Sequence, residues 1–206
     1  MKLAIFGASG ATGRHLVNQA LSSGHSVTAL VRTPDSLQVN HVGLKLIVGE
    51  LYNSVTVESV IRDADAVISV LGARKGKAQN ICTDGLSKII PAMQNVGVKR
   101  LIALSAYGAS ETHNASLFIR FVRSIISEKM RDKDDMEDLV RASHTDWTLI
   151  RPPMLTNGDA SKNYRSGIDL RPGITGRISR ADLASFILQT VVSGSYIHEA
   201  AIVFKE

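Results

Sequence analysis

The chain has 206 residues, 44% of them hydrophobic and 21% charged, which suits one globular domain; its apolar runs are far shorter than the roughly 20 residues of a membrane span. Its single cysteine, Cys82, excludes an internal disulfide and, with no secretory signal pattern at the start, predicts a cytoplasmic protein. The net charge of +5 suits a phosphate-rich cofactor as well as nucleic acid, but the basic residues form no long run, so a nucleic-acid partner is not favoured.

The first motif along the chain is a glycine-rich turn between an apolar run and an amphipathic stretch. Lys2–Phe6 is predicted to be a strand and Ala11–Ser22 a helix, and Gly7-Ala-Ser-Gly-Ala-Thr-Gly13 lies at their junction. Glycines allow a sharp turn and a close approach of a pyrophosphate to the positive end of the helix. The spacing Gly-x-x-Gly-x-x-Gly after a strand therefore predicts a site for NAD or NADP.

Short aliphatic runs alternate with helical patterns along the rest of the chain. We expect further strands at Ser26–Val31, Leu44–Val48, Ala66–Val70, Arg100–Leu104, Trp147–Arg151 and Ala201–Phe204. We expect further helices at Ser54–Ile61, Ala78–Val96, Leu117–Ala142 and Arg180–Val192. Nearly continuous apolar strands that alternate with helices predict an α/β fold. The expected architecture is a Rossmann-like, doubly wound parallel sheet with helices on both faces, in one domain that spans residues 1–206.

Two stretches allow more than one interpretation. The segment of about residues 152–174 is rich in Gly, Pro, Asn and Asp, and we predict an irregular loop that covers the substrate; the alternative is a plain connection. The stretch Leu117–Ile126 is largely apolar, and core packing is favoured there over a dimer surface. The protein is accordingly expected to be a monomer or a homodimer.

The end of the second strand indicates which dinucleotide binds. NAD enzymes usually carry an acidic residue there, whereas this chain has Arg32, whose guanidinium would pair with a 2′-phosphate. We therefore prefer NADPH over NADH as the cofactor; the alternative is that Arg32 is only an exposed strand-end residue. Arg74 lies in a basic cluster after the fourth strand and is either a second phosphate ligand or a solvated charge. Glu50 and Leu51 follow the third strand, where they would flank adenine.

Several motifs together carry a family resemblance. Besides the glycine-rich turn, they are Leu30-Val-Arg32, Val48-Gly-Glu50, Val70-Leu-Gly72, Leu104-Ser-Ala106, Asp146-Trp-Thr-Leu-Ile-Arg-Pro152 and Ile178-Ser-Arg-Ala-Asp-Leu-Ala184. Over essentially its whole length the chain resembles the atypical short-chain dehydrogenase/reductase superfamily. It most resembles the compact NAD(P)H-binding branch, which includes biliverdin-IXβ reductase (also called flavin reductase) and nitrogen-regulator-like proteins.

This resemblance implies a role for each matching position. It implies cofactor contacts for Gly7, Ser9, Gly10, Ala11, Thr12, Arg32, Glu50, Leu51, Leu71, Gly72, Ala73, Arg74, Pro152, Pro153 and Met154. It also implies that Ser105 contacts the nicotinamide or takes part in catalysis. Two positions depart from the family pattern: Glu50 stands where Asp is usual, and Met154 stands where biliverdin-IXβ reductase has His.

The superfamily's usual Tyr-x-x-x-Lys pair is absent. None of the four tyrosines has Lys four residues later, and counting back from the last motif strand puts the Lys position on Lys133 and the Tyr position on Lys129. Lys133 either holds the nicotinamide ribose or is a solvated charge. Tyr107, two residues after Ser105, is either a substitute acid or a packing residue.

The missing phenol bears on the acceptor. A ketone acceptor needs a general acid, worth typically ~10²–10⁴-fold in rate, whereas a conjugated ring takes up charge on a weaker base that solvent or Ser105 can protonate. The leading hypothesis is therefore an NADPH-dependent reductase of a planar acceptor: a flavin, quinone or linear tetrapyrrole. The rival is a non-catalytic NADP-binding redox sensor, and an epimerase-like enzyme is a third, less favoured reading. The six histidines lack metal-ligand spacing, so no metal is expected.

Overall fold

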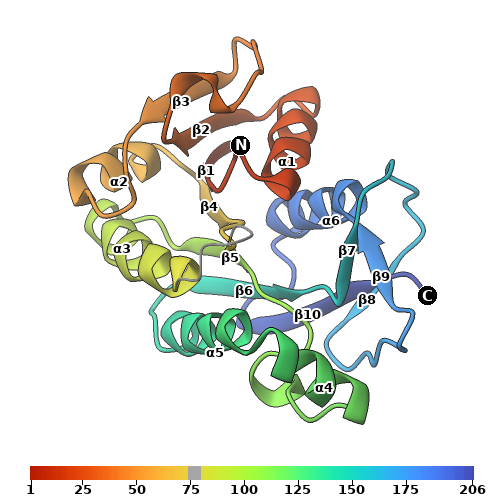
Figure 1. Ribbon diagram of the computed structural model, residues 1–206. Coiled ribbons are helices and arrows are strands. Elements are labelled where there is room, and N and C mark those ends of the chain that lie inside the picture. Colours follow the sequence, from red (N-terminus) through yellow and green to blue (C-terminus); the bar gives the residue numbers. More distant parts are fainter. Residues whose placement is uncertain (74–79) are drawn as a thin grey trace.

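The computed structural model of the chain describes residues 1–73 and 80–206. Within these residues the main sheet has eight strands in the order β3-β2-β1-β4-β5-β6-β10-β8 (Figure 1). The strands are β1 Lys2–Phe6, β2 Ser26–Val31, β3 Leu44–Val48, β4 Ala66–Ser69, β5 Arg100–Leu104, β6 Asp146–Arg151, β8 Arg165–Gly167 and β10 Glu199–Phe204. Neighbouring strands pair in parallel from β3 to β10, and β8 pairs antiparallel to β10. The predicted doubly wound α/β fold is confirmed.

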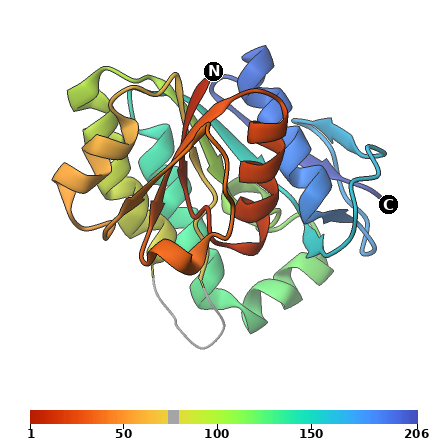
Figure 2. The same cartoon turned by 90° about the horizontal axis from the view of Figure 1, so that it is seen from above.

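Helices cover both faces of the sheet. They are α1 Ala11–Ser22, α2 Ser54–Ile61, α3 Ile81–Val96, α4 Leu117–Ile125, α5 Ser127–Arg141 and α6 Arg180–Ser193. Helices α1 and α6 pack together on one face, and α2, α3 and α5 lie side by side on the other (Figures 1 and 2). None of the helices in the described residues combines the length and the hydropathy that a membrane span requires.

Alternating side chains of the central strands fill the two cores. In β1, Leu3 and Ile5 belong to the core under α1 and α6, whereas Ala4 and Phe6 belong to the core under α2, α3 and α5. All four are at most 1% exposed, because a strand flanked on both sides buries both faces. This is why the strand reads as an unbroken apolar run. The two cores hold the carboxyl ends of β1 to β6 at a common edge of the sheet.

The helix predicted over Leu117–Ala142 is in fact two helices. The break falls at Ile126, whose φ of −116° and ψ of 35° are not helical. The run Ile125-Ile126-Ser127 has low helix propensity, so little is lost by interrupting the helix there. Helix α5 continues along the sheet against α3, and α4 lies beyond its end (Figure 1).

Core packing, expected for the apolar residues of α4, is also wrong. No residue of α4 is buried: Leu117, Phe121 and Ile125 are 80%, 63% and 66% exposed. Ile119 packs against a small cluster around Tyr107. The half-buried residues of α4 are Ile119, Val122 and Arg123, and Arg123 bonds to the carboxylate of Asp134 and to the backbone oxygen of Gly108. Most of the apolar residues of α4 are therefore left at the surface.

The segment 152–174 is less irregular than predicted. It contains β7, Met154–Thr156, and β8, and β7 pairs in parallel with β9, Arg177–Ser179. Strand β8 pairs with β10, which would otherwise be the edge of the main sheet. Strands of three residues are too short to give a recognisable alternation, so composition alone suggested a loop.

Candidate functional site

The glycine-rich turn requires glycine at two positions for reasons of geometry. Gly7 has a φ of +86°, and a Cβ there would lie 2.8 Å from the backbone oxygen of Val70. A Cβ on Gly13 would overlap the backbone oxygens of Gly7 and Ala8. The first residue is thus fixed by a left-handed conformation and the second by close packing of α1 on the turn.

This turn leaves the start of α1 able to bind an anion. Gly10 is the N-cap and offers no side-chain acceptor to the first N–H groups of the helix. The first intrahelical bond runs from the Arg14 N–H to the Gly10 oxygen, so the N–H groups of Ala11 and Thr12 lie before the helical bonding pattern begins. Backbone donors and the positive helix end at a glycine cradle suit a pyrophosphate, so the residues present fit a dinucleotide cofactor.

Two guanidinium groups lie near the end of β2. Arg32 directly follows the strand and is exposed. Arg14 of α1 donates from Nη2 to the Ser36 oxygen (2.8 Å) and from Nε to the Ser9 oxygen (3.2 Å), so it ties the glycine-rich turn to the short helix η1, Pro34–Ser36. No sequence pattern pointed to Arg14, because its contact with Ser36 depends on the packing of α1 against β2.

The ends of β3 and β4 carry the next predicted residues. Glu50 is exposed, and Leu51 is half-buried against the core of α2 and α3. Leu71 packs so closely on α3 that a Cβ on Gly85 would overlap its side chain. Among residues 1–73 and 80–206, no atom would lie within 4 Å of a Cβ on Gly72, so packing in this part of the chain does not require glycine there. Ala73 is half-buried. Arg74 lies outside the described residues.

Lys133 of α5 joins the ends of β4 and β5. Its ammonium donates to the backbone oxygens of Leu104 (2.5 Å) and Leu71 (3.3 Å). Lys133 is therefore half-buried rather than fully solvated, and its ammonium lies at the carboxyl edge of the sheet. Its neighbour Asp132 is buried and accepts from the backbone N–H groups of Cys82 and Thr83, so that it caps α3 from another helix.

Ser105 lies at the end of β5 and bonds to a buried carboxylate. Its Oγ donates to Oε1 of Glu137 (2.5 Å), and Ser105 and Glu137 are 4% and 0% exposed. Arg151, at the end of β6, pairs with both oxygens of Glu137 through Nε and Nη2, and its Nη2 also donates to Glu111 (2.7 Å). Arg141 completes the group through Glu111 at 3.0 Å.

The charges in this group fix one another's ionisation. The hydrogen bond from Arg151 lowers the pKa of Glu111 to about 2, despite some burial. Burial alone would lower the pKa of Arg151, but the carboxylates of Glu137 and Glu111 raise it above its ordinary value. Both oxygens of Glu137 accept from Arg151, and the single proton of the Ser105 hydroxyl is directed at Oε1 of Glu137.

Tyr107 is enclosed by apolar neighbours. It is 7% exposed and packs with Ile202 and Phe204, and burial raises the pKa of its phenol. Its N–H donates to the Pro152 oxygen (2.9 Å), and the Ser105 N–H donates to the Ile150 oxygen (2.8 Å), which joins the chain beyond β5 to β6. After Pro152, Pro153 is half-buried and Met154 is 51% exposed.

The structure thus brings most of the predicted site residues to one edge of the sheet, at the ends of β1 to β6 (Figure 1). It adds Glu137, Arg151 and Glu111 as the partners of Ser105. A signal for Glu137 existed in the sequence, since it lies four residues after Lys133 and hence on the same side of a helix. Arg151 lies in the motif before Pro152, but nothing in the sequence paired it with Glu137.

Several known proteins are similar to this chain over nearly its whole length, including the residues of the candidate site. UPF0659 protein YMR090W of Saccharomyces cerevisiae is 30% identical over 204 residues, covering 93% of this chain and 87% of the relative. Among solved structures, ChuY, an anaerobillin reductase from Escherichia coli O157:H7, superposes with a TM-score of 0.86 at 19% identity, over 98% of this chain and 96% of ChuY.

A second solved structure holds a dinucleotide. A short-chain dehydrogenase/reductase from Veillonella parvula, in complex with NADP, superposes with a TM-score of 0.82 at 16% identity, over 99% of this chain and 94% of that chain. The model of the NAD(P)H-binding family matches residues 7–193, from the first glycine of the turn to the last residue of α6. The chain therefore belongs to the NAD(P)H-binding family, as the resemblance in its motifs predicted.

Proposed function

We propose that this protein is an NADPH-dependent reductase that transfers hydride to a planar conjugated acceptor: a flavin, a quinone or a linear tetrapyrrole. The observation that carries the proposal is the meeting of three features at one sheet edge. These are the uncapped start of α1, the ammonium of Lys133, and the hydroxyl of Ser105. The first suits the pyrophosphate, and the other two suit the nicotinamide half of the same cofactor.

NADPH is preferred over NADH because of the residues after β2. Arg32 is exposed there, and Arg14 carries a second guanidinium to the same segment through Ser36. Two guanidinium groups favour the 2′-phosphate of NADPH, because the ribose hydroxyls of NADH would offer them no negative charge to pair with. Glu50 and Leu51 would then flank the adenine, and Gly72 and Ala73 the path toward the nicotinamide. The NADP held by the Veillonella parvula protein supports this reading.

The surroundings of Ser105 narrow its role. Its proton is directed at Glu137, so the hydroxyl offers lone pairs to the site and would accept a hydrogen bond, for example from a carboxamide N–H group. Ser105 would then orient rather than protonate. Tyr107 is a poor acid for the task, since burial raises its pKa. The proton that accompanies the hydride would come from solvent.

The reduction of a planar acceptor does not require a positioned acid. Bound NADPH supplies the hydride, and the negative charge that the acceptor gains is spread over a conjugated ring, which is a weak base. We assign to Lys133 the nicotinamide ribose, and to Pro152, Pro153, Met154 and the segment 152–174 the cover over the stacked rings. The name of ChuY, an anaerobillin reductase, supports a tetrapyrrole among the candidates.

A non-catalytic NADP sensor is the second candidate. It is favoured by one observation: the position four residues before Lys133 holds Lys129, so the superfamily's usual phenol is missing from that position. Such a protein would bind the cofactor and turn nothing over.

The test is NADPH oxidation by the purified protein with FMN, menadione or biliverdin as acceptor, against controls without enzyme. We expect multiple turnovers, and a fall in the NADPH-to-NADH affinity ratio of roughly tenfold or more for Arg32→Asp, since a phosphate would meet a carboxylate. Exposed Arg62, which follows α2 directly, gives the matched control, Arg62→Asp, with an unchanged ratio. NADPH binding without turnover of any acceptor would favour the sensor. An unchanged ratio in Arg32→Asp would overturn the assignment of Arg32.

A further inference from the structure

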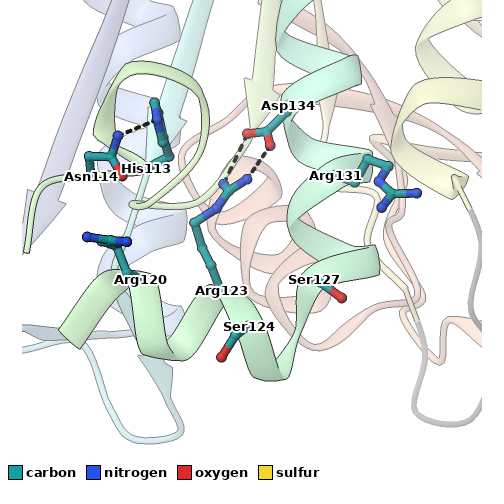
Figure 3. Close-up of a pocket in the computed structure, with 8 residues that line it drawn as sticks. All are labelled: His113, Asn114, Arg120, Arg123, Ser124, Ser127, Arg131 and Asp134. Atoms are coloured by element: carbon teal, nitrogen blue, oxygen red, sulfur yellow. Dashed lines mark hydrogen bonds and ion pairs between the residues drawn. The ribbon is translucent and has the colours of Figure 1, made fainter. Parts of the chain in front are cut away.

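A surface hollow of about 400 Å³ lies where α4 meets α5, and no residue predicted for the cofactor site lines it. Three arginines line it: Arg120 and Arg123 from α4 and Arg131 from α5 (Figure 3). Among the described residues of the lining, Asp134 is the one carboxylate. Figure 3 shows Arg123 directed at Asp134, with Arg120 and Arg131 on either side of that pair.

The carboxylate of Asp134 is already paired with Arg123. Arg123 donates from Nη2 to Oδ2 of Asp134 (2.6 Å) and from Nη1 to Oδ1 (3.3 Å), and its Nη1 also reaches the Gly108 oxygen (2.5 Å). In the part of the chain that the structure describes, neither Arg120 nor Arg131 forms an ion pair. The three guanidinium groups outnumber the one carboxylate of the lining, and a bound anion would balance their charge.

Two further donors face the same junction. Helix α5 begins after Ile126, whose side chain has no acceptor, so the first N–H groups of α5 receive no side-chain cap. The hydroxyl of Ser127 is the first polar side chain of α5 and lines the hollow. An oxyanion with several oxygens, such as a phosphate or a carboxylate, matches this set of donors.

The hollow is built on the segments that carry the candidate catalytic residues. Gly108, which accepts from Arg123, follows Ser105 and Tyr107 on the chain beyond β5. Asp134 also accepts from the Ser110 N–H (2.7 Å). The hollow thus shares Asp134 with the segment that follows Ser105. A ligand that reaches the end of β5 could therefore extend into the hollow.

The anion is not one of the cofactor's phosphates. The expected pyrophosphate site is at the start of α1, beyond β1, and the 2′-phosphate site is beyond β2. In the sheet, β4 separates β1 from β5, and the helices that form the hollow follow β5. The hollow thus lies on the far side of the candidate nicotinamide site from the adenosine half, where the acceptor would lie.

We propose that this hollow binds the anionic group of the acceptor, through Arg120 and Arg131, and so makes the enzyme prefer planar acceptors that carry a phosphate or carboxylate. The inference rests on the proposed reductase function. The two sources of the anion are the phosphate of a flavin mononucleotide and the carboxylates of a linear tetrapyrrole. Each has a neutral counterpart with the same ring system, riboflavin and the dimethyl ester of biliverdin.

The experiment compares the wild type with the double variant Arg120→Gln/Arg131→Gln, and with Arg62→Gln as the matched control. Equilibrium binding of FMN and riboflavin is followed by flavin fluorescence, and steady-state KM and kcat are measured with both. We expect the double variant to bind FMN at least ~10-fold more weakly than the wild type and to have a KM for FMN at least ~10-fold higher. The affinities for riboflavin and NADPH should change less than about twofold. Biliverdin and its dimethyl ester are compared in the same way.

The outcomes separate the two proposals. A loss of affinity confined to FMN would show that the hollow binds a phosphate. A loss of affinity confined to biliverdin would show that it binds a carboxylate. If FMN binding is weakened in the double variant but NADPH is not oxidised, the anion site is supported and the proposed reductase function is refuted. If NADPH is oxidised and the double variant affects charged and neutral acceptors equally, the function stands and the hollow is refuted. The hollow is also refuted if the wild type binds both members of each pair equally.

Discussion

Gly7 and Gly24 have nearly the same backbone conformation but different surroundings. Their φ values are +86° and +77°, in the region that favours glycine. A Cβ on Gly7 would lie 2.8 Å from the Val70 oxygen, whereas a Cβ on Gly24 would meet nothing within 4 Å. Gly24 therefore serves only the turn between α1 and β2, while Gly7 serves both a turn and the approach of the glycine-rich segment to β4.

This difference predicts unequal effects of alanine. Gly24→Ala should lower the free energy of unfolding by about 1–2 kcal/mol, the cost of the left-handed conformation alone. Gly7→Ala should cost roughly twice that, because a backbone clash is added to the strain. It should also weaken NADPH binding, which Gly24→Ala should leave unchanged. Urea unfolding and a fluorescence titration with NADPH measure both effects; equal losses in the two variants would contradict the packing role of Gly7.

At the scale of the element, the segment 152–174 is held by the start of α6. The carboxylate of Asp182 accepts from the Lys162 N–H (2.8 Å) and from the hydroxyls of Ser161 (2.9 Å) and Ser179 (3.0 Å). Burial opposes the ionisation of Asp182, but these hydrogen bonds lower its pKa overall. Ser179 is the N-cap of α6, and its hydroxyl accepts from the Asp182 N–H. The hold of Asp182 on Ser161 and Lys162 was not visible in the sequence.

Asp182→Asn should loosen this segment. An amide has one acceptor oxygen and no charge, so at least one of the three bonds is lost, at a cost of about 1.5–3 kcal/mol for a bond to a charged group. Hydrogen exchange should accelerate at residues 154–167 and remain slow at the centre of the sheet. Asp169→Asn, at an exposed position of the same segment, is the control with no acceleration. Equal exchange in both variants would mean that Asp182 does not anchor the segment.

For the whole molecule, the ion-pair group around Arg151 makes stability depend on pH. The pKa of Glu111 is about 2 in the folded state, below its ordinary value of 4.5. A depressed folded pKa gives stability that is present above pH 4.5 and is lost as the pH falls toward 2. Asp182, whose pKa is also lowered, acts in the same direction.

Urea unfolding of the wild type and Glu111→Gln at pH 7, 5, 4 and 3 tests this dependence. The Glu111 side chain is 59% exposed, so the gap at pH 7 should be only about 1 kcal/mol after solvent screening. It should shrink as the pH falls below 4.5, because the protonated wild-type residue resembles the amide. A gap that stays constant down to pH 3 would show that the pairing with Arg151 does not set the acid sensitivity.

The sequence by itself determined the fold and predicted the cofactor half of the candidate site. Glycine spacing, apolar strands and amphipathic helices are local patterns, and the order of the elements then restricts the sheet topology. The tertiary structure decided what distant residues do to one another. It joined Ser105 to Glu137 across 32 residues, Lys133 to Leu71 across 62, and Arg14 to Ser36. It also left Leu117, Phe121 and Ile125 of α4 exposed. These contacts depend on how the helices pack on the sheet, which no local pattern encodes.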